Sequence, residues 1–94
     1  MVPAHRIIPG ILAQVIRPAP LCPEKVEFAW RASVGPAVGR ATRARIDERG
    51  VLVITAQDAQ WEREVGRSLG LIRSRLETLL GPDAFITVEI KSHG

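Results

Sequence analysis

The chain has 94 residues, enough for one small domain, and its single cysteine excludes the disulfide-stabilised secreted class. Its 13 Lys and Arg residues outnumber its 10 Asp and Glu residues, which gives a net charge of +3 and a pI near 10.0. Residues 1–47 carry the whole excess, and 11 of the 13 bases are arginines, the side chains best suited to bidentate phosphate contacts. This balance favours an anionic partner and leaves the nature of that partner open.

The first 23 residues predict a short helix followed by a proline-rich connector. Apolar residues recur at helical spacing over residues 8–16, and Pro18, Pro20 and Pro23 favour an extended chain after them. The apolar run is too short to span a bilayer, which needs about 20 apolar residues. It also lacks the pattern of a signal peptide. We therefore expect a cytoplasmic protein that has no membrane partner.

A second helix is predicted from Glu24 to Val34, with Trp30 as a core anchor. The positions expected to face the core are Val26, Phe28 or Ala29, Trp30 and Val34. Gly35 and Pro36 end this helix, with room for one further turn at residues 37–38. Three residues separate Gly35 from Gly39, whereas a KH-type phosphate loop has two between its glycines. The segment therefore favours a helix-stopping turn over a phosphate cradle.

Residues 42–56 predict a β-hairpin. The first strand alternates loosely over residues 42–47, the second is a β-branched run over residues 51–56, and Gly50 between them can adopt a positive φ. Four arginines gather at this hairpin: Arg40, Arg43, Arg45 and Arg49. They fit either a charged strand edge that prevents aggregation or a surface that binds a phosphate backbone. Charge alone does not separate these two interpretations.

The remaining residues predict one long helix and a last strand. Asp58 is a candidate N-cap, and an apolar stripe of period 3.6 follows it as far as the helix stop at Gly81 and Pro82. The stripe consists of Trp61, Val65, Leu69, Ile72, Leu76 and Leu79 or Leu80. Gly66 and Gly70 on this helix are expected to mark the close approach of a neighbouring segment. Residues 85–90 then alternate as a strand.

The predicted order of elements, α-α-β-β-α-β, indicates an α+β fold. We expect a two-layer sandwich with a three-stranded sheet and with helices on one face, in a single domain of residues 1–94. This topology resembles a KH-like domain, and the resemblance raises the expectation of nucleic-acid contact.

No residue pattern predicts catalysis, a metal site or a cofactor. His5 and His93 lie at opposite ends of the chain, and Cys22 lies in the connector, so no zinc-ligand spacing is present. The acidic residues of the long helix have basic partners one turn away, Glu64 with Arg67 and Arg73 with Glu77. We expect neither enzyme activity nor a small-molecule substrate.

Six short motifs follow one another along the chain. They are Phe28-Ala-Trp30, Val34-Gly35-Pro36, Ala41-Thr42-Arg43, Asp47-x-x-Gly50-Val-Leu52-Val-Ile54, Ala59-Gln-Trp61 and Glu64-Val65. In this order and spacing they resemble the bacterial DciA family of helicase-operator proteins, over about residues 24–90. The chain departs from the family pattern at Ala41, Ala44 and Asp58, where the family has His, Pro and Ser. We also expect it to lack the basic C-terminal tail of many members.

The resemblance implies a noncatalytic protein that binds the replicative DNA helicase and single-stranded or forked DNA, and that assists helicase loading. The expected DNA contacts are Arg40, Arg43, Arg45 and Arg49, and the expected helicase contacts are Arg63, Arg67 and Arg73. Structural roles are expected for Trp30, Trp61, Gly35 and Gly50. Two alternatives remain open. One is a protein-interaction module, binding the helicase or itself, without nucleic-acid affinity, and the other is a KH-like RNA-binding protein.

Overall fold

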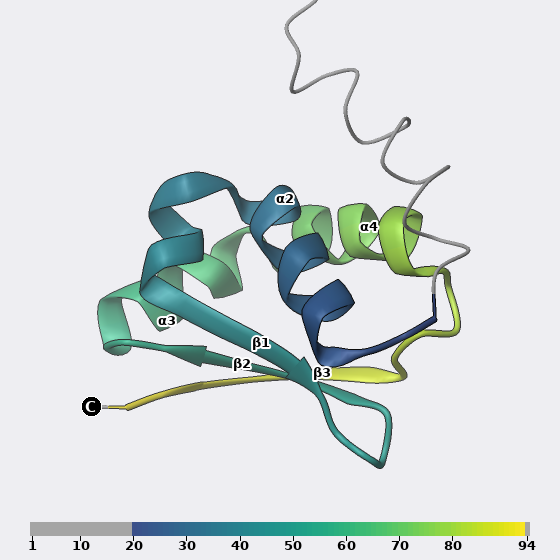
Figure 1. Ribbon diagram of the computed structural model, residues 1–94. Coiled ribbons are helices and arrows are strands. Elements are labelled where there is room, and N and C mark those ends of the chain that lie inside the picture. Colours follow the sequence, from purple (N-terminus) through teal and green to yellow (C-terminus); the bar gives the residue numbers. More distant parts are fainter. Residues whose placement is uncertain (1–19, 94) are drawn as a thin grey trace, which may run out of the picture.

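Residues 20–93 are described by the computed structural model, in which helices pack on one face of a three-stranded sheet (Figure 1). The elements in chain order are α2 (Pro23–Ala41), β1 (Thr42–Ile46), β2 (Val51–Ala56), α3 (Ala59–Arg67), α4 (Leu69–Leu80) and β3 (Thr87–Ser92). The predicted α+β fold is confirmed. The helix predicted over residues 8–16 lies outside the described residues. Within residues 20–93, no helix has the length and apolar character needed to cross a membrane.

The sheet has the order β1-β2-β3, with β1 antiparallel and β3 parallel to β2. Side chains alternate between the two faces of each strand. Ala44 and its β2 neighbour Ile54 are therefore buried under the helices, whereas Arg43 and Arg45 are exposed on the opposite face. A parallel pair needs a crossover connection, and α3 and α4 form it. The face of the sheet without helices thus carries two of the predicted arginines.

The core lies between the helices and the sheet, and Trp30 is its largest fully buried side chain. Leu52, Ile54 and Leu76 belong to the same cluster, and each is almost fully buried. Trp61, expected as a second core anchor, is only partly buried and lies outside this cluster. The reason is that α3 is short and buries a single residue, Val65. The aromatic part of the core is therefore Trp30 and Phe85 rather than two tryptophans.

A kink divides α2 where the sequence predicts that the helix ends. Gly35 has φ 84° and ψ 174°, a conformation that is essentially restricted to glycine, and Pro36 follows it. The chain then returns to helix as far as Ala41, which is longer than the single further turn expected. Pro23 begins the helix, where its missing N–H costs nothing.

The continuous helix expected between Asp58 and Gly81 is instead two helices. Asp58 caps α3 as predicted, because its Oδ1 accepts the backbone N–H of Trp61 at 3.0 Å. Ser68, with φ −105° and ψ 10°, separates α3 from α4. Gly66 and Gly70 lie on either side of this break, and a Cβ at either position would meet nothing within 4 Å. The prediction that these glycines mark close packing is therefore wrong, because the break leaves both facing open space.

The predicted hairpin is present, and its turn is built around Asp47. The Oδ1 atom of Asp47 accepts the backbone N–H groups of Arg49 at 2.9 Å and Val51 at 3.0 Å, and Gly50 has φ 81°. The last strand begins at Thr87, two residues later than expected. The side chain of Phe85 is buried in the core, but its backbone precedes the sheet, so the strand starts later than the alternating pattern predicts.

Candidate nucleic-acid interface

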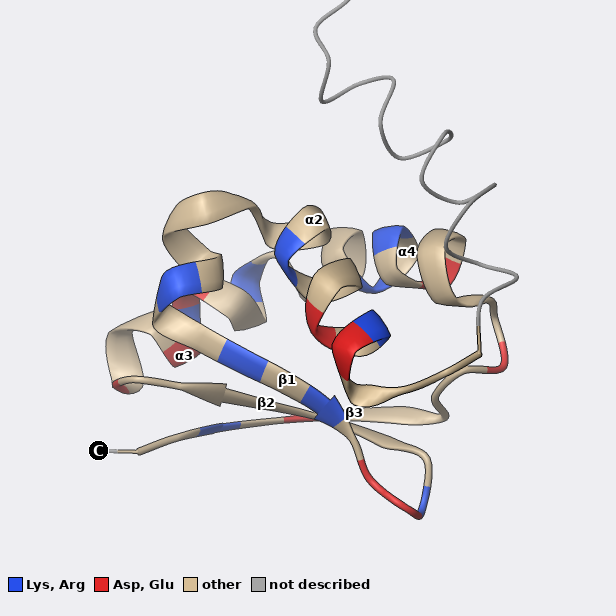
Figure 2. Ribbon diagram, in the orientation of Figure 1, with Lys and Arg blue, Asp and Glu red and all other residues tan. Residues whose placement is uncertain are grey.

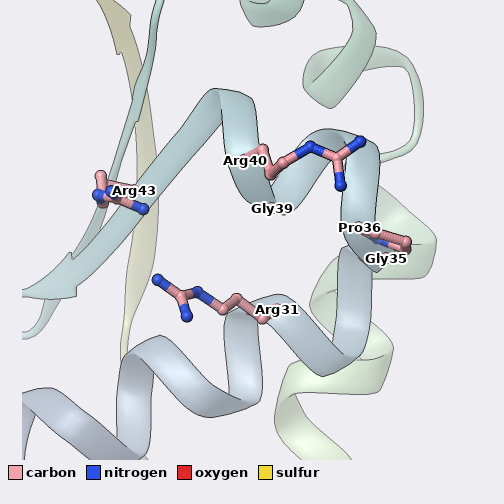
Figure 3. A pocket seen from close by; sticks show the side chains of 6 residues that line it. All are labelled: Arg31, Gly35, Pro36, Gly39, Arg40 and Arg43. Carbon is pink, nitrogen blue, oxygen red and sulfur yellow. The ribbon is translucent and has the colours of Figure 1, made fainter.

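Three arginines line one cleft at the junction of α2 and β1. The cleft has a volume of about 460 Å³ and is lined by Arg31, Gly35, Pro36, Gly39, Arg40 and Arg43. Figure 3 shows Gly35 and Pro36 at one end and Arg43 at the other, with the side chains of Arg31 and Arg40 along the two sides. We call this the arginine cleft.

The kink at Gly35 creates the arginine cleft. It turns the second part of α2 back toward the first, so that Gly39 is buried against the side chain of Arg31. A Cβ on Gly39 would lie 3.6 Å from Cγ of Arg31, an ordinary contact distance. Arg31 and Arg40, nine positions apart in the sequence, thereby line the same cleft. The first residues of β1 then bring Arg43 to its open end.

One carboxylate faces the arginines of the cleft. The Oε1 atom of Glu27 lies 3.3 Å from Nε of Arg31 and 3.6 Å from Nη1 of Arg43. That buried oxygen makes no hydrogen bond, so the two ion pairs are loose. Within residues 20–93, no carboxylate lies within 4.0 Å of the guanidinium group of Arg40. The cleft therefore has excess positive charge that Glu27 neutralises only in part.

The positive surface continues from the cleft onto the open face of the sheet. A second, smaller hollow of about 130 Å³ shares Arg40 and Arg43 with the cleft and is also lined by Ala41, Thr42, Thr55, Gln57 and His93. Lys91 pairs in register with Thr55, and Thr55 pairs with Arg43. Figure 2 shows basic residues along β1, one acidic and one basic residue on β3, and both acidic and basic residues in the hairpin turn. Arg45 extends the basic row of β1 on the same face.

Arg49 lies apart from the other arginines of the predicted cluster. It belongs to the hairpin turn, which follows the end of β1 distant from Arg40. Its guanidinium pairs with Asp47 at 3.2 Å. The backbone N–H of Val51 is the main group that lowers the pKa of the Asp47 carboxyl below its ordinary value, and Arg49 lowers it further. Arg49 therefore contributes to the turn rather than to the cleft.

The sequence did not single out Arg31, which the structure places in the cleft. Its signal was weak, because Arg31 reads as an exposed residue of an ordinary amphipathic helix that pairs with Glu27 at i−4. Only the kink at Gly35 makes it a neighbour of Arg40. The Gly35–Gly39 segment, expected as a simple helix stop, forms one side of the cleft as well.

The three arginines expected to contact a protein partner do not form one site. Arg63 is exposed on α3, and Arg67 pairs with Glu64 at 3.2 Å. Arg73 has a structural role, because it pairs with Glu77, donates to the carbonyl of Ile86 at 3.1 Å and stacks over the ring of Phe85 at 5.4 Å. It thereby ties α4 to the segment that leads into β3.

Within residues 20–93, no group of three or more His, Cys, Asp or Glu residues is placed to hold a metal ion. Cys22 is exposed and unpaired, and His5 lies outside the described residues. No family model matches the chain, and no curated protein matches it significantly.

Proposed function

We propose that this protein is a noncatalytic DNA-replication accessory protein that binds nucleic acid through the arginine cleft and assists the loading of the replicative helicase. The observation that carries the proposal is that Arg31, Arg40 and Arg43 line one cleft, with Glu27 the only carboxylate within 4.0 Å of their guanidinium groups among residues 20–93. A guanidinium group is a planar fork of donors that fits phosphate oxygens in pairs. Three such groups around an open cleft suit a phosphodiester backbone better than a compact neutral ligand.

The low level of neutralisation supports phosphate binding. The side chains of Arg31 and Arg43 are 60% and 67% exposed, so their pairs with Glu27 contribute little to folding. A phosphate that replaced Glu27 as their partner would release counterions from the nucleic acid on binding. The neighbouring hollow around Thr55 and Gln57 offers polar contacts for the next phosphate along the strand.

The helicase part of the proposal rests on the resemblance to the DciA family. Arg63 and Arg67, both exposed on α3, remain the proposed contacts, whereas the structural bonds of Arg73 argue against a role for it. A pull-down with purified replicative helicase after nuclease treatment tests this part separately. Retention of the helicase supports direct contact, and loss of the helicase after nuclease indicates a nucleic-acid bridge.

The nucleic-acid part is tested by removing charge from the cleft. We expect Arg40→Gln combined with Arg43→Gln to weaken binding of a fluorescent DNA strand by about 10- to 100-fold at low salt. Titrations across salt concentrations should show a shallower slope of log affinity against log salt, by about 1.4 for two lost contacts on a single strand. The melting temperature should change little, because both side chains are exposed.

Arg49→Gln is the matched control for each single variant, Arg40→Gln and Arg43→Gln. It removes the same charge from a neighbouring position of the sequence, but from the hairpin turn rather than from the cleft. If Arg49→Gln weakened binding as much as Arg40→Gln, net charge rather than the cleft would govern affinity, and the assignment of the cleft would be wrong. The same titrations with an RNA strand separate the proposal from RNA binding, which predicts a preference for the 2′-OH.

A further inference from the structure

An exposed aromatic side chain lies next to the arginine cleft. Phe28 is 47% exposed, although its chain neighbours Ala29 and Trp30 are fully buried. It lines a shallow groove of about 530 Å³ together with Pro23, Glu24, Glu27, Arg31 and Ala44. Arg31 lines both this groove and the arginine cleft, so the two hollows lie next to each other. We call the second hollow the Phe28 groove.

The groove and the cleft differ in charge. The groove carries two carboxylates, Glu24 and Glu27, and one guanidinium group, Arg31, whereas the cleft carries three guanidinium groups and no carboxylate among its lining residues. A phosphate is therefore attracted to the cleft and repelled from the groove. A neutral, flat group attached to that phosphate fits the groove, where it can stack on Phe28.

Phe28 and Arg31 are close enough to contact one nucleotide together. They are i,i+3 neighbours on the first part of α2, a spacing that puts Cβ atoms about 5–6 Å apart on one helix face. We propose that the site binds single-stranded nucleic acid, with a phosphate in the arginine cleft and the unpaired base stacked on Phe28. This inference rests on the proposed function and deepens it. A duplex keeps its bases stacked inside the helix, so it cannot place one on Phe28.

The test compares three probes with the full chain and its Phe28→Ala variant. The probes are an oligothymidylate, a strand of the same length made of abasic sites, and a duplex. Phe28→Ala should weaken oligothymidylate binding by roughly 5- to 30-fold, as expected for the loss of stacking with one base. It should change binding of the abasic strand and of the duplex by less than about 2-fold, because neither places a base on Phe28.

Two further variants make the result specific. Phe28→Trp keeps a stacking surface, so it should bind oligothymidylate about as well as the wild type does. The fluorescence that this substitution adds to that of Trp30 and Trp61 should be quenched by oligothymidylate and not by the abasic strand. Ile86→Ala is the matched control, since it removes an apolar side chain that is even more exposed, outside the groove.

The outcomes separate this inference from the proposed function. If the wild-type chain binds none of the three probes, the proposed function itself fails. If it binds them but Phe28→Ala changes nothing, or weakens all three equally, the cleft stands and the base site on Phe28 is overturned.

Discussion

At the scale of single residues, Thr42 connects the core to the arginine cleft. Its Oγ1 accepts the indole N–H of Trp30 at 2.8 Å and donates to the carbonyl of Val38 at 2.6 Å. Each of these three residues directly precedes a residue of the cleft, namely Arg31, Gly39 and Arg43. One buried hydroxyl therefore holds both parts of α2 and the start of β1 in the arrangement that the cleft needs.

Thr42→Val should destabilise the protein by about 1–3 kcal/mol, because it leaves the indole N–H of Trp30 buried without a partner. Thr42→Ser keeps the hydroxyl and loses only a methyl group, at a cost of about 1 kcal/mol. In urea, the free energy of unfolding should therefore be highest for the wild type, lower for Thr42→Ser and lowest for Thr42→Val. A Thr42→Val variant as stable as the wild type would show that the hydroxyl contributes nothing.

At the scale of elements, two interruptions of helices shape the molecule, and the sequence predicted only one of them. Gly35 and Pro36 form a strong stop signal. The break at Ser68 has no such signal, because the stripe from Val65 through Leu69 to Ile72 keeps helical spacing across it. The spacing of apolar residues indicates which face of a helix is turned toward the core. Two successive helices can turn the same face toward the core, so this spacing does not reveal the break between them.

The candidate site could also be predicted only in part, because spacing along the sequence does not show where the chain folds back on itself. The density of arginines around Arg43 was visible, and so was the hairpin that exposes Arg43 and Arg45. Arg31 lines the cleft because the kink folds α2 back on itself. Arg49 does not line it, because Arg49 lies in the hairpin turn and pairs with Asp47. Neither contact follows from composition or from spacing.

Two glycine-to-alanine substitutions should change the stability of the protein in opposite directions. Gly35→Ala should destabilise the protein by about 1–3 kcal/mol, because Gly35 has a positive φ that side chains rarely adopt, even though a Cβ would have space. Gly70→Ala lies in α4 with open space around it and should stabilise by about 0.5–1 kcal/mol. Thermal unfolding of both variants checks this. A neutral Gly35→Ala would mean that the kink does not depend on this residue.

At the scale of the whole molecule, the arrangement of charge matters more than its sum. A net charge of +3 is modest for a protein that binds nucleic acid. The hairpin turn carries Asp47 and Glu48, while the opposite end of the hairpin carries Arg43 and adjoins Arg40 at the end of α2. The molecule therefore presents an uneven field, and Glu27, the one acid among residues 20–93 that pairs with arginines of the cleft, partly offsets their positive charge.

Glu27→Gln should raise the affinity for a DNA strand by about 2- to 10-fold, because it removes the anion that competes with phosphate for Arg31 and Arg43. Stability should fall by no more than about 1 kcal/mol, because the two arginine partners are largely exposed and their ion pairs with Glu27 are loose. Glu77→Gln makes the same change of net charge at the pair with Arg73 on α4 and should leave affinity almost unchanged. A loss of affinity in Glu27→Gln would instead assign Glu27 to positioning the arginines.

The parallel pairing of β3 with β2 has a consequence for the order of folding. The residues of the arginine cleft all come from one short stretch of sequence, residues 31–43. Val51 of β2, in contrast, pairs with Thr87 of β3, which follows both α3 and α4 in the sequence. A hairpin forms in about 1–10 μs, but distant pairings require a costly loop closure first. During synthesis the cleft residues emerge early, whereas Leu76 and Phe85, which belong to the same core cluster as Trp30, emerge late. The core beneath the cleft can therefore be completed only after most of the chain has been made.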